Sequence, residues 1–325
     1  MTVLVTGGAG YIGSHVTLAL LDRGDKVVVL DDLSTGNRAQ VDDRASFIEG
    51  DIADGGLVQR VIAEHDVDAV LHFAGSIVVP DSVADPLRYY DNNVVKSRAL
   101  LEAVIKSGVR QFIFSSTATV YAPDAPQPLA EDAQKGPISP YARTKLMMEW
   151  MLEDAARAHA LRFVALRYFN VAGADARGRS GQSGPQATHL IKRAAQAALG
   201  RIPHLDIFGT DYPTPDGTGV RDYIHVSDLA TAHLLALDSL RDGAASTVYN
   251  CGYGRGLSVR EVIAGMERVT GETLPVQEGP RRAGDPPTLI ADPARIKAAL
   301  GWHPLHDDLD GIIRSALAWE RRFNA

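Results

Sequence analysis

A tyrosine and a lysine lie four residues apart near the middle of the chain, at Tyr141 and Lys145. Residues at this spacing share one face of a helix, and Pro140 directly before the tyrosine is typical of a helix start. A phenol with the ordinary pKa of about 10 is a poor base at pH 7, but nearby positive charge favours its ionised form. The pair therefore predicts a phenol that moves protons with help from an ammonium group.

The segment before this pair ends in a run of hydroxyl groups. Residues 112–121 read Phe-Ile-Phe-Ser-Ser-Thr-Ala-Thr-Val-Tyr, an apolar strand that leads into two serines and a threonine. We expect Thr117 to hydrogen-bond a reacting alcohol and to relay its proton to Tyr141. The alternative is that these hydroxyl side chains only end a strand, and this alternative is stronger for the two serines than for Thr117.

The chain opens with a glycine-rich turn directly after a short apolar strand. Residues 6–13 read Thr-Gly-Gly-Ala-Gly-Tyr-Ile-Gly, which places glycines at Gly7, Gly10 and Gly13. Small residues let the backbone N–H groups of a helix N-terminus approach a pyrophosphate. A plain tight turn is the alternative, but the turn together with the Tyr–Lys pair predicts a nicotinamide dinucleotide and transfer of a hydride.

Acidic side chains at the end of the second predicted strand narrow the choice of cofactor. Asp31 or Asp32 can accept hydrogen bonds from the adenosine ribose and would repel a 2′-phosphate, so we expect NAD and not NADP. We favour Asp31 for this contact; the alternative is that it only caps the strand. Residues after the third and fourth strands are predicted to line the adenine and ribose: Asp51, Ile52, Phe73, Ala74 and Gly75.

Short β-rich runs alternate with helical patterns through the first half, which indicates βαβ units on a parallel sheet. The predicted strands are 2–5, 26–30, 46–49, 69–73, 111–115 and 163–168, and the predicted helices are 12–23, 57–64, 86–107 and 141–159. Continuous apolar runs such as residues 27–30 suit strands that are covered on both faces. Right-handed crossovers bring the carboxyl ends of such strands to one edge, where ligands bind.

The character of the chain changes after Gly173, where the polar loops 175–186, 209–219 and 279–287 follow. Two of these loops contain arginines, which suggests a lid over an anionic substrate. We therefore expect an α/β protein with a Rossmann-type, doubly wound parallel sheet in a dinucleotide-binding domain over residues 1–174. A smaller mixed α/β substrate-binding domain is expected over residues 175–325, partly interleaved with the first, because residues 247–251 have the pattern of a sheet strand.

The composition excludes several classes of partner. The 325 residues carry a formal charge of -7, and this diffuse acidic balance argues against nucleic acid or an anionic membrane. No apolar run approaches the ~18 residues of a membrane span, and no basic and apolar leader precedes the first strand. The single cysteine, Cys251, fits a reducing cytoplasm. His303 and His306 form the closest histidine pair, which we expect to be solvated, and no metal is expected.

Taken together, these motifs resemble those of the extended short-chain dehydrogenase/reductase family, and within it those of the UDP-glucose (UDP-galactose) 4-epimerases. The resemblance runs nearly from end to end. The Tyr-x-x-x-Lys motif is shared by the whole superfamily, whereas residues 211–226 are much more specific to the 4-epimerases. The resemblance depends on residues 6–15, 89–94, 114–121, 139–145, 167–170, 208–213, 216–226 and 281–285.

The resemblance implies reversible 4-epimerisation of UDP-glucose and UDP-galactose with bound NAD, through a 4-keto sugar that is reduced again on its other face. Tyr141, Lys145 and Thr117 would be the catalytic residues. The implied cofactor contacts add Tyr11, Ile12, Asn92, Ser115, Tyr141, Lys145 and Tyr168 to those above. The implied substrate contacts are Thr117, Tyr141, Asn170, His189, Phe208 and Arg221, with Arg282 on phosphate and Asp285 on the uridine ribose. The alternative for the two arginines is a surface ion pair, with Asp222 or Asp285.

Four positions depart from the pattern of the family. Ile77 stands where many members have a lysine that contacts the cofactor, and Thr117 replaces a serine. His189 replaces an asparagine that contacts substrate. Leu289 replaces a bulky aromatic residue that often closes the sugar pocket, so we expect the pocket to be roomier and to admit an N-acetyl group.

The family implies a homodimer in which the predicted helices 86–107 and 141–159 pair across the interface, and a place in galactose metabolism. A 4-epimerase of another UDP-sugar (an N-acetylhexosamine, a pentose or glucuronate) remains an alternative, as does a non-catalytic NAD-binding sensor. A 4,6-dehydratase is disfavoured, because Ala118 and Thr119 offer no second acidic group beside Thr117.

Overall fold

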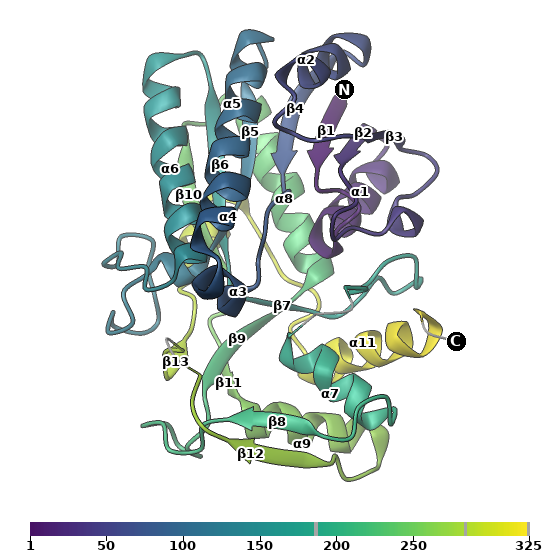
Figure 1. Cartoon of the computed structure of the whole chain (residues 1–325), viewed down its shortest axis with the longest axis vertical. Helices are drawn as coiled ribbons and strands as arrows, with labels where there is room; N and C mark the ends of the chain where they lie inside the picture. The colour runs from purple at the N-terminus through teal and green to yellow at the C-terminus, as the bar shows by residue number, and fades with distance from the viewer. Residues whose placement is uncertain (185–187, 283–284, 324–325) are drawn as a thin grey trace. The chain divides into compact units, whose positions relative to one another are not determined.

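The computed structural model describes residues 1–184, 188–282 and 285–323 (Figure 1). The chain forms two compact units. Unit 1 combines residues 1–122, 135–167 and 230–249, and unit 2 combines residues 123–134, 168–229 and the chain from 250 onward. Parts of two predicted polar loops, residues 185–186 and 283–284, lie outside the described residues. The predicted assignment of one ligand to each half of the chain, with a boundary at residue 174, stays a prediction.

Unit 1 is built on a seven-stranded sheet with the order β10-β6-β5-β4-β1-β2-β3 (Figure 1). The strand pairs from β5 to β3 are parallel, and β1 lies beside β4 at the middle of the sheet. This order confirms the predicted doubly wound α/β fold, in which ligands bind beyond the carboxyl ends of the strands where the order reverses. The strands are β1 (Thr2–Thr6), β2 (Lys26–Asp31), β3 (Ser46–Glu49), β4 (Val67–His72), β5 (Gln111–Thr117), β6 (Arg162–Tyr168) and β10 (Thr247–Cys251).

Helices cover this sheet because its strands are apolar on both faces. Leu4 packs in one core cluster with Val58, Leu100 and Met148, whereas the neighbouring Val3 is fully buried outside that cluster. Since successive side chains of a strand point to opposite faces, both faces of β1 are buried, as the continuous apolar runs predict. The helices are α1 (Tyr11–Arg23), α2 (Gly55–Glu64), α3 (Val79–Ala84), α4 (Pro86–Tyr90), α5 (Lys96–Lys106), α6 (Pro140–Ala158) and α8 (Val226–Arg241), with 3-10 turns η1 (Arg38–Gln40) and η3 (Ala118–Val120).

The prediction of one continuous helix over residues 86–107 is wrong in its middle. A π-helical turn, η2 (Asp91–Val95), separates α4 from α5. In this turn the Asn93 side chain accepts a hydrogen bond from the Ser76 backbone N–H at 2.8 Å and donates to the Ser76 carbonyl at 2.9 Å. Asn92 also donates to the Ser76 hydroxyl, at 2.9 Å. These tertiary contacts account for the wider turn, and such turns are frequent at functional sites.

Unit 2 has two small sheets and four helices in its described part. One sheet joins β7 (Asn170–Ala172), β9 (Val220–His225), β11 (Gly256–Ser258) and β13 (Thr288–Leu289), and the other pairs β8 (Leu205–Phe208) with β12 (Val276–Gly279). Ile191, Ile207, Met266 and Ile313 belong to the apolar cluster between these elements. The helices are α7 (Leu190–Ala198), α9 (Val259–Thr270), α10 (Ala294–Leu300) and α11 (Leu309–Phe323).

Among the helices of the described residues, none combines the length and the apolar character needed to cross a membrane.

Candidate active site

Helix α6 carries both members of the Tyr–Lys pair on its first two turns. Ser139 caps the helix by accepting a hydrogen bond from the Ala142 N–H at 3.2 Å, and Pro140 occupies the first helical position. Lys145 is only 3% exposed. Its Nζ donates to the Ser115 carbonyl of β5 at 2.7 Å and lies 5.0 Å from the centre of the Phe114 ring. The lysine is therefore fixed against the strand that carries the predicted hydroxyl groups.

The Tyr141 phenol is hydrogen-bonded to Thr117, so the structure brings together the three predicted catalytic residues. Burial raises the pKa of Tyr141 to about 12, and the Thr117 hydrogen bond acts in the opposite direction. Burial also lowers the pKa of Lys145 to about 8, which leaves its amine charged at pH 7. The chain alone thus keeps the phenol protonated. The pKa reduction that we expect for a catalytic tyrosine depends on further positive charge, such as that of an oxidised nicotinamide.

The glycine-rich turn leads from β1 into α1, and no side chain caps the N-terminus of the helix by a hydrogen bond. Gly7 has a φ of +72°, and a Cβ there would lie 2.5 Å from the Ala74 backbone nitrogen, so the packing of the chain itself requires glycine. A Cβ on Gly10 would meet only the Gly7 carbonyl, at 3.2 Å. Gly10 provides no side-chain cap, and the first turn of α1 has no acidic residue. This open N-terminus fits an anionic pyrophosphate.

The two acidic residues at the end of β2 differ in their surroundings. Asp31 is buried, and its carboxylate accepts hydrogen bonds from the N–H groups of Ala9 and Leu33, both at 2.9 Å. Burial raises the pKa of Asp31. Asp32 is exposed and accepts a hydrogen bond from the Ser34 hydroxyl at 2.6 Å. Asp31 therefore braces the glycine-rich turn, and its predicted contact with a ribose stays a prediction.

The other predicted cofactor residues lie close to the carboxyl ends of the strands. Asp51 pairs with Lys96 at 2.6 Å, and Ile52 beside it is buried. The Phe73 and Ala74 N–H groups both donate to the Thr6 carbonyl, and these two hydrogen bonds join the end of β4 to the end of β1. The remaining members lie in α1, at the ends of β5 and β6, after β4 and in the π-helical turn: Tyr11, Ile12, Gly13, Ser115, Tyr168, Gly75 and Asn92.

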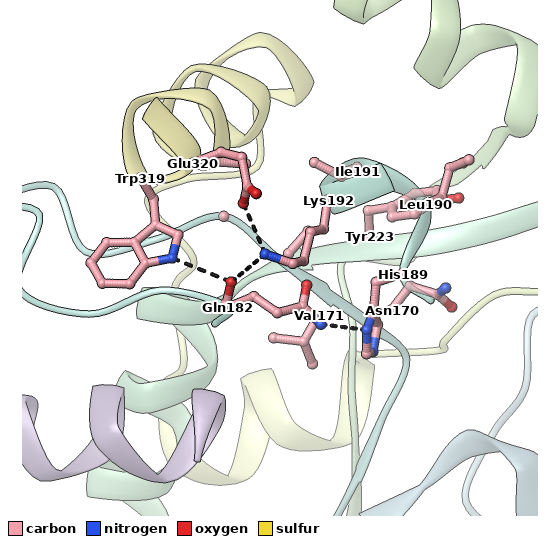
Figure 2. A pocket seen from close by; sticks show the side chains of 13 residues that line it. Asn170, Val171, Gln182, His189, Leu190, Ile191, Lys192, Tyr223, Trp319 and Glu320 are labelled. Atoms are coloured by element: carbon pink, nitrogen blue, oxygen red, sulfur yellow. Dashed lines mark hydrogen bonds and ion pairs between the residues drawn. The ribbon is translucent and has the colours of Figure 1, made fainter. Parts of the chain in front are cut away.

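Two predicted substrate residues of unit 2, Asn170 and His189, line one small cavity of about 20 Å³ (Figure 2). Figure 2 shows the Gln182 side chain reaching His189, with 2.5 Å between the Gln182 Nε2 and the His189 Nδ1. Burial, with a smaller contribution from the Lys192 charge, lowers the pKa of His189 to about 4. The imidazole is therefore neutral at pH 7 and accepts a hydrogen bond from the amide at Nδ1.

The predicted anion-binding arginines of unit 2 have partners in this structure. Arg221 donates to Asp285 at 2.7 Å, which is one of the two ion pairs that the sequence offers as an alternative to ligand binding. The Arg282 guanidinium lies over the Phe208 ring, 3.8 Å from its centre. Leu289 of β13 is the register partner of Arg221. The predicted substrate residues of unit 2 thus form two groups, and their roles toward substrate stay predictions.

Sequence reasoning missed several buried polar residues around the catalytic side chains. Asn93 bonds to Ser76 and to the Thr144 hydroxyl of α6, the latter at 3.1 Å. Glu149 and Arg167 form a buried ion pair behind β5. The sequence does hold a signal for Glu149, because it continues the four-residue spacing of Tyr141 and Lys145. No comparable local signal exists for its partner.

The histidine of β4 has the surroundings of a core residue. His72 is buried, with its two ring nitrogens hydrogen-bonded to Thr6 and Ser97, as expected for a core histidine. Cys251 is fully buried. In the part of the chain that the structure covers, no three His, Cys, Asp or Glu side chains gather as a metal site would require.

Comparison with known proteins identifies the family. Residues 3–252 match the NAD dependent epimerase/dehydratase family. This chain belongs to that family. It is 60% identical to a UDP-glucose 4-epimerase of Azospirillum brasilense over 98% of this chain and 92% of the relative. The crystal structure of UDP-glucose 4-epimerase from Brucella ovis in complex with NAD is 47% identical, with a TM-score of 0.94 over 98% of this chain and 97% of that one.

A second solved structure agrees. The UDP-glucose 4-epimerase from Stenotrophomonas maltophila, with bound NAD and formylated UDP-arabinopyranose, is 43% identical to this chain. Its TM-score is 0.96, over 100% of this chain and 99% of that chain. The similarity therefore extends over both units, and it confirms the resemblance to the 4-epimerases.

Proposed function

We propose that this protein is an isomerase that interconverts UDP-glucose and UDP-galactose by inverting C4 of the sugar, with NAD as its cofactor. The observation that carries the proposal is the joint placement of Tyr141, Thr117 and Lys145 in a chain that resembles UDP-glucose 4-epimerases over its whole length. A sensor that only binds NAD would not need a phenol, a hydroxyl and an ammonium group held together.

In the proposed reaction Tyr141 takes the proton of the sugar 4-hydroxyl and later returns it, with Thr117 as the relay between alcohol and phenol. Lys145 stays charged at pH 7 and favours the phenolate by its proximity on the same helix face. Arg221 and Arg282 hold the diphosphate, so that the nucleotide stays bound while the sugar presents either face. Bound NAD would supply the acceptor and the donor of the hydride.

The chain's own residues fit this cofactor. The N-terminus of α1 has neither a side-chain cap nor an acidic residue in its first turn. The α1 N-terminus would therefore hold the pyrophosphate, and Asp31 or Asp32 the adenosine ribose. Contacts from Asp51, Ile52 and the segment 73–75 complete the proposed set.

The decisive experiment incubates the purified protein with UDP-galactose deuterated at C4 and follows the products by NMR. We expect UDP-glucose that keeps the deuterium at C4, because the hydride stays on the cofactor and never exchanges with water. Complete loss of the label to solvent would indicate enolisation and would refute the proposal.

Other UDP-sugars are the second candidate class, and Leu289 is the observation that favours it. Leu289 is the register partner of Arg221, and it stands where the family often has a larger aromatic residue. The same assay with UDP-N-acetylglucosamine, a UDP-pentose and UDP-glucuronate ranks these substrates. Turnover of UDP-N-acetylglucosamine comparable to that of UDP-glucose would support the expected roomier pocket.

Arg221 is expected to contribute to nucleotide affinity. Arg221→Gln removes the guanidinium but keeps a polar side chain, and a charge-assisted hydrogen bond contributes about 1.5–3 kcal/mol. We therefore expect the Kd for UDP, measured by calorimetry, to rise about 10- to 100-fold. Arg260→Gln is the matched control, because Arg260 forms an exposed ion pair with Glu278. Equal affinities of the two variants would contradict the assignment.

We also propose a cytoplasmic homodimer that acts in galactose metabolism. Apolar side chains stand exposed on the elements that the family pairs: Leu87 on α4, Val95 in η2 and Trp150 on α6. Trp150→Glu is expected to convert the dimer to a monomer in light scattering after gel filtration. Leu305→Glu changes an exposed apolar residue of unit 2 and should leave the mass unchanged. A monomeric unmodified protein would refute this proposal.

A further inference from the structure

Glu149 of α6 and Arg167 of β6 form a buried ion pair beside β5, the strand that ends at Thr117. Glu149 is 1% exposed and Arg167 is 3% exposed. Arg167 binds the carboxylate with two hydrogen bonds, Nε to Oε1 at 3.0 Å and Nη2 to Oε2 at 2.6 Å. Removing two charges from water costs free energy, and apolar residues of similar volume often stabilise a fold at least equally well. What an ion pair adds is direction, since a two-point contact fixes the orientation of both side chains.

Glu149 extends a row of contacts between α6 and the end of β5. Tyr141, Lys145 and Glu149 lie on successive turns of one helix face. Thr117 bonds to the Tyr141 phenol, the Ser115 carbonyl accepts from Lys145, and the Ser116 hydroxyl donates to Glu149 Oε1 at 2.5 Å. Each of the last three residues of the strand is therefore joined to a different turn of the helix.

Arg167 contacts Tyr121, at the far end of the segment 116–121 that contains Thr117. Its Nη1 donates to the Tyr121 hydroxyl at 2.8 Å, and its guanidinium lies 4.9 Å from the centre of the Tyr121 ring. Tyr121 directly follows η3, the 3-10 turn that begins after Thr117. Residues 116–121 are thus held on one side through Ser116 and on the other through Tyr121, and both contacts lead to one ion pair.

We infer that the Glu149–Arg167 ion pair positions the Thr117 hydroxyl against Tyr141 by holding both ends of the segment that carries it. Glu149 and Arg167 are then positioning residues, which act through Ser116 and Tyr121. A displacement of about 1 Å at a reacting group can lower a rate by ~10²-fold, so small movements of this segment matter. The inference rests on the proposed function, in which Thr117 relays the proton.

The test removes one hydroxyl at each end of the segment and leaves the ion pair in place. Ser116→Ala and Tyr121→Phe are each expected to lower kcat for UDP-galactose about 10- to 100-fold, with KM changed less than about twofold. Ser239→Ala is the control, because its hydroxyl bonds only within α8, to Ala236 at 2.8 Å. It should leave kcat unchanged.

A double-mutant cycle separates positioning from general damage to the fold. If Ser116 acts by placing the Thr117 hydroxyl, Ser116→Ala should cause no further loss of kcat in a Thr117→Val protein. If Ser116→Ala lowers kcat equally in the unmodified protein and in the Thr117→Val protein, the inference is overturned. It is also overturned if Ser116→Ala and Tyr121→Phe each leave kcat unchanged.

A spectroscopic readout keeps the inference testable apart from activity. With tyrosine labelled by ¹³C at Cζ, and Tyr141→Phe to assign the signal, we expect Ser116→Ala to shift the Tyr141 resonance in the same direction as Thr117→Val. An inactive unmodified protein would refute the proposed function but leave this measurement intact. If Thr117→Val shifts the Tyr141 resonance but Ser116→Ala does not, the inference is refuted, whereas the proposed function is unaffected.

Discussion

Tyr141→Phe is expected to lower kcat by about 10³-fold while the protein still binds NAD. The substitution keeps the aromatic ring and removes only the oxygen that hydrogen-bonds to Thr117 and that would exchange a proton with the sugar. The measurements are the rate with UDP-galactose and the Kd for NAD from calorimetry.

Tyr90→Phe provides the matched control for this variant. Tyr90 is half-buried on α4, and loss of its hydroxyl should leave the rate within about twofold of that of the unmodified protein. The assignment of Tyr141 as the acid/base group is wrong if Tyr141→Phe epimerises at a rate near that of this control.

Lys145→Met is expected to lower kcat about 10²-fold, because the variant loses the positive charge that favours the phenolate. Methionine is similar in length and apolar, so it can occupy the buried site that the lysine leaves. The effect is expected to be smaller than that of Tyr141→Phe, since the proton acceptor itself remains.

The same variant is expected to change how stability depends on pH. The pKa of Lys145 is lowered to about 8 in the folded chain, whereas an unfolded lysine has a pKa of about 10.4. Between these values the unfolded chain holds more protons, so the contribution of Lys145 to the unfolding free energy rises with pH, by about 3 kcal/mol in total. Burial of the amine thus penalises the folded state below pH 8, and this penalty disappears as the pH approaches 10.

Urea unfolding of the cofactor-free protein at several pH values from 7 to 10 measures this contribution. The difference in unfolding free energy between the unmodified protein and Lys145→Met should grow in favour of the unmodified protein as the pH rises. Parallel curves for the two proteins would show that Lys145 has an ordinary pKa in the folded state. The contribution of Tyr141 to the unfolding free energy falls as the pH rises, but only above about pH 10, because the pKa of Tyr141 in the folded chain is raised to about 12.

Local pattern was sufficient to predict most of unit 1. The predicted strand 46–49 coincides with β3, and the predicted helix 141–159 is shifted by one residue from α6, because Ser139 and Pro140 are strong local start signals. The glycine-rich turn and the Tyr–Lys pair could be located for the same reason, since each is a short motif with its own chemistry. The alternation of strands and helices also indicated that the carboxyl ends of the parallel strands and the glycine-rich turn would meet at one edge of the sheet.

The features that sequence could not supply depend on contacts between distant segments. The helix predicted across residues 86–107 contains a π-helical turn, because Asn93 bonds to Ser76 and to Thr144, which lies 51 residues further along the chain. Arg167 reaches Glu149 from a different strand, and no local pattern of residues encodes that partnership. The raised pKa of Tyr141 also follows from burial, which the sequence does not specify.

The π-helical turn has a consequence for efforts to make this protein more heat-resistant. Asn92 and Asn93 are neighbours in the chain, and both of them contact Ser76 from within the wider π-helical turn. Replacing residues 91–95 with strong helix formers would remove both asparagines, and deleting one residue of the turn would rotate part of the turn away from the loop after β4. A more robust helix obtained in this way would therefore loosen the loop that carries Gly75, so engineers should leave the irregular turn unchanged.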